Sequence, residues 1–263
     1  MALFRALWNY RGFILGSVKR EFQIKYRNSL LGAAWNVINP LAMILVYTVI
    51  FSQIMKARLE GVESTFGFGI YLCSGMLTWA LFAEIATRSQ TTFIENANLL
   101  KKISFPRLCL PAIVILSSLL NFSIIFGLFT GFLVLTGNFP GIAYLALFPL
   151  LAIQILFATG LGMTLGIFNV FFRDVGQAFG VVLQFWFWFT PIVYPANILP
   201  ESTKSILSLN PMSSLISGYQ GIVVYGAWPQ WGSLLTVTLL SLALCAVGWK
   251  LFRAKVGEIV DEL

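Results

Sequence analysis

Long stretches without a Lys, Arg, Asp or Glu residue recur along this chain, and they limit its possible folds more than any other feature. Between residues 32 and 252, uncharged runs of 19 or more residues follow one another. A helix needs about 20 mostly apolar residues to cross a bilayer, and it satisfies its own backbone hydrogen bonds inside lipid. The pattern therefore predicts a membrane protein with several helical spans.

The composition supports this prediction. Hydrophobic residues make up 58% of the chain and charged residues 10%, with a mean hydropathy of +0.85. A soluble domain has about 25% charged residues. The core of a soluble globule is the alternative explanation for an apolar run, but a chain of 263 residues does not need so many of them.

We expect an all-α membrane protein that forms a single domain over residues 1–263. The six expected spans are residues 33–55, 66–87, 108–136, 142–172, 176–194 and 231–252. The third and fourth spans are longer than a bilayer requires, so we expect them to tilt or kink, with Pro111 and Pro149 as natural kink points.

The basic residues indicate how the spans are oriented. With six spans, fourteen of the seventeen Lys and Arg residues fall on one side of the membrane, and Lys56, Arg58 and Lys204 fall on the other. Basic loops stay in the cytoplasm, so both termini are expected there. The net charge of +7 reflects this asymmetry, and its spread over short loops argues against a nucleic-acid site.

Residues 206–228 carry no charge and admit three interpretations. A further span would place the C-terminal basic residues outside. Asn210-Pro211 and several serines interrupt the stretch, which favours two short helices that dip into the outer leaflet as part of a re-entrant hairpin over 195–230. An apolar surface loop is the third possibility.

The first 31 residues have the pattern of an amphipathic helix at the cytoplasmic surface. Ile14, Val18, Phe22, Tyr26 and Leu30 share one helical face, and Arg20, Gln23 and Arg27 share the other. Such a helix lies in the membrane interface with its basic side towards the headgroups. A plain basic topology anchor is the alternative interpretation.

The chain has little material for catalysis of its own. It has no histidine, no Cys-x-x-Cys pair and no phosphate-binding GxxxxGK[ST] loop, and Cys73, Cys109 and Cys245 are expected to be small core residues. No metal or cofactor site is predicted. If the chain uses ATP, a partner must supply the nucleotide site together with Mg²⁺.

Glu84 is an acid inside the second expected span, and Arg88 follows it at i+4. An ion pair on one helix face is the favoured interpretation, with a proton relay as the alternative. A proton-coupled transporter would need paired buried acids, and only Glu84 is available. A membrane glycosyl- or phosphotransferase would need clustered acids or histidines near one surface, and the chain has none.

Three polar or aromatic segments between the spans carry the remaining information. Residues 95–107 combine basic residues, an apolar stripe and a proline, as in a short helix that docks in a partner's groove. Arg173 and Asp174 form a tight turn with an expected ion pair. Residues 185–189 are five consecutive aromatics, which fit either a lipid-facing belt or a pathway wall that contacts sugar rings.

Five sequence stretches resemble the ABC-2-type polysaccharide export permeases in their order along the chain. They are KREFQIKYRNSLLGAAWNVINP (19–40), NANLLKKISFP (96–106), VFFRDVGQ (170–177), FTPIVYPANILP (189–200) and LNPMSSLISGYQ (209–220). The resemblance is strongest to the membrane subunits of lipopolysaccharide O-antigen exporters, with capsule and teichoic-acid exporters as near relatives.

The resemblance implies a homodimer in the bacterial inner membrane, with two separate ATPase subunits beneath it. Its implied substrate is a polysaccharide on an undecaprenyl diphosphate carrier, moved from cytoplasm to periplasm. Residues 195–229 match the family's outer hairpin.

The resemblance and the residue patterns give three sets of candidate site residues. The ATPase-coupling set is Asn98, Leu99, Leu100, Lys101, Lys102, Phe105, Pro106, Arg173 and Asp174. The pathway aromatics are Phe185, Trp186, Trp188, Phe189 and Tyr194. Arg20, Lys25 and Arg27 are candidates for contact with the carrier's diphosphate, although they also fit a topology anchor.

Overall fold

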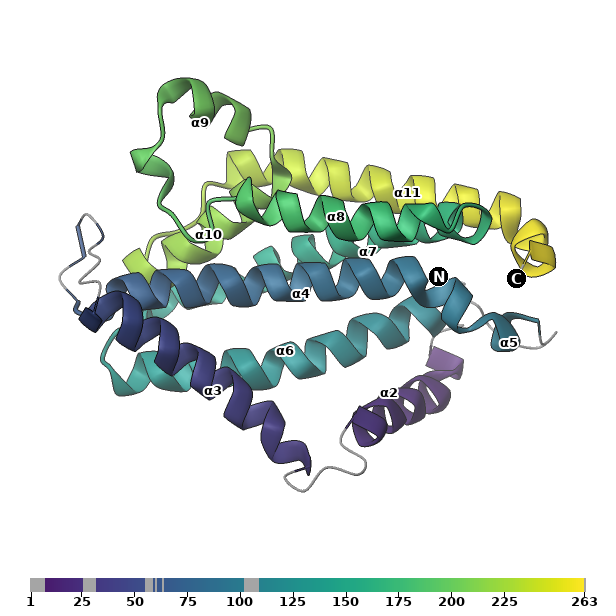
Figure 1. The fold of residues 1–263 in the computed structure, drawn as a ribbon, viewed down its shortest axis with the longest axis horizontal. Helices are drawn as coiled ribbons and strands as arrows, with labels where there is room; N and C mark the ends of the chain where they lie inside the picture. Colours follow the sequence, from purple (N-terminus) through teal and green to yellow (C-terminus); the bar gives the residue numbers. More distant parts are fainter. Residues whose placement is uncertain are drawn as a thin grey trace.

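The computed structural model describes residues 8–25, 32–54, 59, 61–62, 64–101 and 109–262, and these residues form helices without a strand (Figure 1). The first half contains α2 (Arg11–Lys25), η1 (Gly32–Ala34), α3 (Trp35–Tyr47), η2 (Thr48–Ile54), α4 (Gly67–Glu95), α5 (Ala97–Leu100) and α6 (Cys109–Leu135). The second half contains η3 (Gly141–Ala146), α7 (Leu147–Phe171), α8 (Asp174–Trp188), η4 (Ala196–Ile198), α9 (Glu201–Leu207), α10 (Pro211–Tyr225) and α11 (Trp231–Glu262). The prediction of an all-α fold is confirmed for this part of the chain.

Within the described residues, four helices are long and apolar enough to cross a membrane: α4, α6, the continuous helix η3–α7, and α11. The predicted spans 108–136 and 142–172 agree with α6 and η3–α7 to within one residue at each end. α4 and α11 continue beyond their predicted ends at 87 and 252. Charged residues ended those predicted spans, but Lys, Arg and Glu are good helix formers and do not break a helix.

The predicted spans 33–55 and 176–194 correspond to shorter helices. α3 and the π-helical segment η2 follow each other without a break, and their apolar part is Val37–Phe51. α8 has only 15 residues. A count of six spans therefore stays a prediction.

The two expected kink points lie near the starts of α6 and α7, and a bend at either one stays a prediction. Pro111 is the third described residue of α6, and Pro149 lies just after the junction of η3 with α7 in one continuous helix. Pro40 instead lies inside α3. There its ring faces the carbonyl four residues earlier and disturbs the regular hydrogen-bond pattern.

α7 lies at the centre of the bundle, between α4 and α11. Glycines let these helices approach closely. A Cβ atom at Gly162 would lie 2.5 Å from the carbonyl oxygen of Ala86, and one at Gly160 would lie 2.9 Å from the backbone nitrogen of Cys245. Small residues at helix–helix contacts replace the hydrophobic driving force that is missing inside lipid, because they let backbones pack directly.

The segment predicted as a re-entrant hairpin forms two helices, α9 and α10, and an ordinary surface loop is excluded. α10 packs against α4, α7 and α11. Its most buried side chains are at most 1% exposed, and they are Met212, Leu215, Ile216, Tyr219 and Ile222. A helix packed this deeply on protein fits the requirement that re-entrant segments do not face lipid alone.

α2 packs its predicted apolar face against the start of α6. Ile14 and Val18 are 4% and 6% exposed and contact Cys109 and Ile113. The side of α2 that was expected to enter the membrane interface is thus partly covered by protein. Tyr26 and Leu30 of the predicted face lie outside the described residues.

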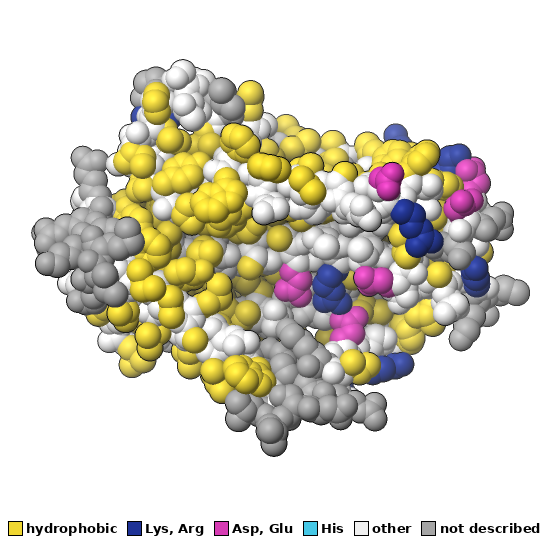
Figure 2. Space-filling model, viewed as in Figure 1, with side chains coloured by type: hydrophobic (Ala, Val, Ile, Leu, Met, Phe, Trp, Pro, Cys, Tyr) yellow, Lys and Arg dark blue, Asp and Glu magenta, His cyan; other side chains and the backbone are white. Residues whose placement is uncertain are grey.

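The two ends of the bundle differ. α5 and the end of α11 lie at one end, which we call the α5 end, and α9 lies at the other, the α9 end (Figure 1). Figure 2 shows apolar side chains over much of the visible face, whereas most visible charged side chains lie over the half towards the α5 end. Many large apolar side chains are exposed, as expected for helices that contact lipid.

Candidate functional site

The predicted coupling segment, residues 95–107, is described as far as Lys101, so that Lys102, Phe105 and Pro106 lie outside the described residues. α4 ends at Glu95, where the side-chain amide of Asn96 donates to the carbonyl oxygen of Thr92 at 2.9 Å. The single turn α5 follows. Asn98 and Lys101 are exposed and Leu99 is half-buried, so these three present the surface of the segment.

Leu100 points into the bundle instead of outwards. It is 2% exposed and belongs to a cluster that joins α4, α5, α6, α7 and α11. Its buried partners there are Phe93, Leu110, Ile167, Val170, Phe252 and Ile259. The sequence predicts both Leu99 and Leu100 as docking residues. The burial of Leu100 instead gives it a packing role that fixes α5 to the bundle.

Arg173 and Asp174 lie in the turn between α7 and α8, which also lies at the α5 end (Figure 1). Both side chains are exposed, and the expected ion pair between them does not form. Asp174 is instead in the first turn of α8, where a negative charge is favourable next to the helix dipole. The described contact residues of the two segments therefore lie at one end of the molecule.

A buried amide fixes the position of this turn, and the sequence did not reveal it. Asn169, 4% exposed, accepts a hydrogen bond from the backbone N–H of Gly176 at 2.9 Å and donates to the carbonyl oxygen of Gln90 on α4 at 3.5 Å. A Cβ atom at Gly176 would lie 2.8 Å from the Asn169 amide oxygen. The turn is thereby held close to the part of α4 that leads into α5.

The five aromatics of residues 185–189 divide between the core and the surface. Trp186 points inwards and packs edge-on against Trp79, Phe82 and Phe157, with ring centroids 5.4–6.2 Å apart. Phe187 is also partly buried against Trp79. These contacts place Trp186 among core residues of its own chain.

The other aromatics of this segment face outwards. Phe185, Trp188 and Phe189 are 61%, 60% and 68% exposed. The hydroxyl of Tyr194 donates to the carbonyl oxygen of Trp188 at 2.8 Å, and the hydroxyl of Tyr71 donates to the carbonyl oxygen of Tyr194 at 3.0 Å. The exposed rings lie on the surface that lipid, a second copy or a transported chain would contact.

Asn210 joins the end of α8 to the start of α10. Its amide oxygen accepts from the Trp186 indole N–H at 2.8 Å and from the backbone N–H of Met212 at 3.0 Å. Its amide nitrogen donates to the carbonyl oxygen of Phe189 and the hydroxyl of Thr190. An Asn before a Pro at the first helical position is a helix-start signal, so the sequence could have identified this cap.

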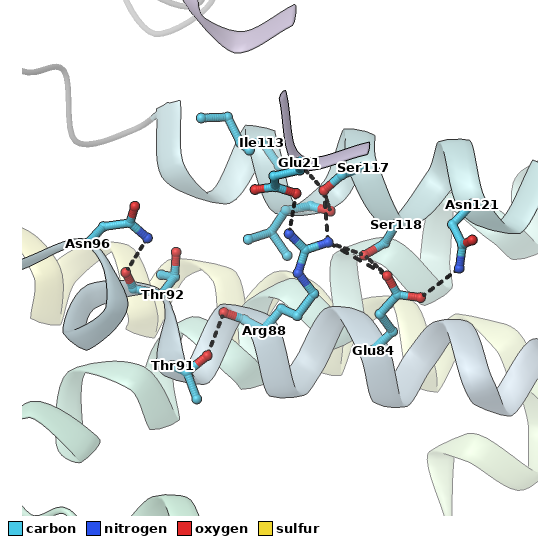
Figure 3. A network of polar contacts seen from close by, with 11 residues as sticks. Glu21, Glu84, Arg88, Thr91, Thr92, Asn96, Ile113, Ser117, Ser118 and Asn121 are labelled. Atoms are coloured by element: carbon cyan, nitrogen blue, oxygen red, sulfur yellow. Dashed lines mark hydrogen bonds and ion pairs between the residues drawn. The ribbon is translucent and has the colours of Figure 1, made fainter. Parts of the chain in front are cut away.

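Glu84 and Arg88 form the predicted ion pair, with 3.6 Å between their charged atoms. Figure 3 shows that Arg88 also reaches across to α2 and α6. Its guanidinium lies 2.6 Å from a carboxylate oxygen of Glu21 and donates to the hydroxyl of Ser117 at 2.8 Å. Glu84 in turn accepts from Ser118 at 3.0 Å. The arrangement supports a structural role for Glu84 rather than a proton relay.

This network borders an open cavity of about 430 Å³ between α2, α4 and α6. The sequence patterns did not identify Glu21 as a partner in this network, although it is the only acid among the first 59 residues. Of the predicted diphosphate contacts, Arg20 is exposed on α2, whereas the Lys25 side chain and Arg27 lie outside the described residues.

Metal-binding groups are not gathered anywhere in the described ranges: no set of three or more Cys, Asp or Glu side chains is placed to hold an ion. Cys73, Cys109 and Cys245 are free thiols, the first two of them buried. Cys73 and Cys109 pack as small apolar core residues, as the sequence indicated, whereas Cys245 is partly exposed and its thiol donates to the carbonyl oxygen of Leu156 at 3.3 Å.

Sequence comparisons identify the family. Residues 14–224 match the ABC-2 type transporter family. The O-antigen export system permease protein RfbA of Myxococcus xanthus is 31% identical over 264 residues, covering 99% of each chain. A protein of the same name from Klebsiella pneumoniae is 29% identical, covering 89% of this chain and 88% of its own. The polysialic acid transport protein KpsM of Escherichia coli is 21% identical, covering 90% of each chain.

The matched region extends from α2 to α10 and so includes the coupling segment, the α7–α8 turn and the cap of α10. The chain therefore belongs to the ABC-2 type transporter family of membrane proteins.

Proposed function

We propose that this chain is the permease subunit of an ATP-driven exporter that moves undecaprenyl-diphosphate-linked polysaccharide of the O-antigen type from cytoplasm to periplasm. The observation that carries the proposal is the similarity over 99% of both chains to an O-antigen export permease. Similarity from end to end supports a common task more strongly than a shared segment would.

The proposed topology has six spans, with both termini in the cytoplasm of a bacterial cell and the α9 end in the periplasm. α3 and η2 together comprise residues 35–54, which is about 30 Å of helix and matches the apolar thickness of a bilayer. α8, with 15 residues, reaches only about 22 Å. Asn210, the cap of α10, is hydrogen-bonded to Trp186 and Phe189 at the end of α8. We infer that α10 fills the outer leaflet that α8 does not reach.

The chain is proposed to work as a homodimer with two ATPase subunits, which bind ATP and Mg²⁺. Docking is assigned to the α5 end, where Asn98, Leu99 and Lys101 of the coupling segment and the exposed pair Arg173 and Asp174 lie. Lys102, Phe105 and Pro106 complete the proposed coupling set.

The proposed glycan pathway uses the outward-facing aromatics Phe185, Trp188 and Phe189, with Tyr194 supporting Trp188 from behind. Their flat faces suit contact with the apolar C–H faces of sugar rings. Trp186 supports this surface from the core. Arg20, Lys25 and Arg27 are proposed to attract the diphosphate of the carrier, as basic clusters beside a membrane attract anionic headgroups.

Capsule export is the second candidate function, and the similarity to the polysialic acid transport protein KpsM favours it. Teichoic-acid export belongs to the same class of activity. These candidates differ in the glycan and not in the division of labour between permease and ATPase.

Deletion of the chain tests the proposal and separates the candidates. The deletion strain is expected to lose surface O-antigen and to accumulate the lipid-linked glycan inside the cell, and the wild-type chain should reverse both effects. Loss of capsule with normal O-antigen would favour the second candidate. Normal amounts of every surface glycan would contradict the proposal.

A further inference from the structure

A cavity separate from the polar network lies at the α9 end, between α9, α10 and the start of α11. It has a volume of about 660 Å³ and is open to the surrounding solvent or headgroup region. That volume is within the usual range of about 300–1,000 Å³ for pockets that bind small molecules. No described residue of the coupling segment or of the aromatic cluster on α8 borders it.

Hydroxyl groups dominate the polar lining. The lining serines are Ser208, Ser213, Ser214, Ser217 and Ser233. Ser208 and Ser233 donate to backbone carbonyl oxygens at 2.7 Å and 2.8 Å, which leaves their oxygens free to accept. The hydroxyls of Ser214 and Ser217 have no hydrogen-bond partner in the described part of the chain.

Ser213 gives independent support for a ligand. It lines the cavity, it is only 6% exposed, and its hydroxyl has no hydrogen-bond partner among the described residues. Buried polar groups are normally paired, so an unpaired hydroxyl at the wall of a cavity indicates a partner that enters from the cavity.

A tryptophan, Trp228, also contributes to the lining and is 58% exposed. Among the described residues of the lining, Lys204 is the one that is charged and none is a carboxylate. Several hydroxyls next to an indole face suit a pyranose ring, which offers hydroxyls at its rim and C–H groups on its face. A diphosphate would require more positive charge.

We propose that this cavity binds one or two sugar units of the polysaccharide as it leaves the pathway on the α9 side. The inference rests on the proposed function, which supplies the glycan and makes the α9 end the exit. The bound units would hold the emerging chain and hinder its return between transport steps.

Gly221 allows the cavity to be filled without disturbing the fold. It lines the cavity, and a Cβ atom built there meets no atom within 4 Å. Gly232 lies outside the cavity and has the same free space. Gly221→Leu therefore blocks the site, and Gly232→Leu is its matched control. Trp228→Leu removes the indole ring from the lining, and Trp231→Leu is the control for an exposed tryptophan outside the lining.

The test uses the permease–ATPase complex in lipid nanodiscs and fluorescein-labelled O-polysaccharide released from its lipid by mild acid. Fluorescence anisotropy is expected to show binding that weakens about tenfold in Gly221→Leu and Trp228→Leu, with both controls unchanged. Equal binding by Gly221→Leu and wild type would overturn the inference, as would the absence of binding to the wild type. A spontaneous disulfide between two copies of Ser217→Cys would also overturn it, because a second copy would then cover the cavity.

The deletion experiment separates this inference from the proposed function. If the wild-type chain restores surface glycan but does not bind the polysaccharide, only the cavity assignment fails. If deletion leaves every surface glycan unchanged, the proposed function fails.

Discussion

The carboxylate of Glu21 on α2 lies 2.6 Å from the guanidinium of Arg88 on α4, although the two residues are 67 positions apart in the sequence. Arg88 also contacts Glu84 on its own helix. The amino-terminal helix is thus attached to the same helix that leads into the coupling segment. A displacement of α5 would reach α2 through one continuous α4.

Loss of Arg88 should destabilise the protein more than loss of its partner Glu21. Arg88→Leu leaves Glu21 and Glu84 without their cation and should cost about 1–3 kcal/mol. Glu21→Gln keeps a hydrogen-bonding group in a partly exposed position and should cost about 0.2–1 kcal/mol. Thermal unfolding in detergent measures both. Lys255→Leu is the control, since it breaks an exposed pair with Glu258; a loss as large as that of Arg88→Leu would contradict the special role of this network.

The close approach of α4 and α7 should make Gly162 intolerant of even one methyl group. Gly162→Ala places a Cβ atom 2.5 Å from the carbonyl oxygen of Ala86, so the helices must separate at a cost of about 1–3 kcal/mol. Gly131→Ala on α6 meets no atom within 4 Å and should be neutral or slightly stabilising. The melting temperatures of the two purified variants decide this, and equal values would refute the packing argument.

Asn210 should be essential for the junction between α8 and α10. Asn210→Ala removes the helix cap, worth about 0.5–2 kcal/mol, and leaves the indole N–H of Trp186 unpaired. Asn210→Asp retains the accepting oxygen and should lose less stability. A thermal denaturation series of the two variants checks the order. If Ala were tolerated as well as Asp, the cap would not hold the junction.

Substitution of Trp186 and of Trp188 should affect the protein in different ways. Trp186→Leu removes a ring that contacts Trp79, Phe82 and Phe157, so it should lower thermal stability and protein level. Trp188 is 60% exposed, and Trp188→Leu should leave stability unchanged. Export at normal protein level should fall in Trp188→Leu if the ring contacts the glycan. Normal export by that variant would leave a lipid-facing belt as the explanation.

The exposed residues at the α5 end should control assembly with the ATPase. Lys101→Glu and Arg173→Glu reverse charges on the proposed docking surface without touching the core, and ATPase co-purification should fall while membrane insertion persists. Lys204→Glu at the α9 end is the control. Leu100→Glu is unsuitable as a docking test, because it buries a charge in a packed cluster and should unfold the α5 end. Unchanged co-purification in Lys101→Glu and Arg173→Glu would show that the ATPase docks on another surface.

The sequence predicted those features that depend on local composition. The limits of α6 and η3–α7 follow from uncharged runs, and the Glu84–Arg88 pair follows from helical spacing. Tertiary placement could not be predicted in the same way. Nothing near Glu21 in the sequence indicates that its partner is Arg88, since α2 and α4 are brought together by α6, against which both helices pack.

Apolar character also failed to distinguish lipid-facing from core positions. Trp186 and Trp188 have the same hydropathy, yet Trp186 is partly buried against the core and Trp188 is exposed on the surface. The same ambiguity led to Leu100 being grouped with Leu99 as a docking residue. In a soluble protein burial would separate such neighbours by polarity, but in a membrane protein both environments are apolar.

Transport by purified components tests the central claim most directly. The chain and its ATPase partner would be placed in proteoliposomes together with lipid-linked polysaccharide, and entry of the glycan into the lumen would be measured as protection from an added glycosidase. We predict that protection requires this chain, the ATPase and hydrolysable ATP together. Protection that is equal without this chain, or equal with a non-hydrolysable ATP analogue, would contradict its assignment as the permease of an ATP-driven exporter.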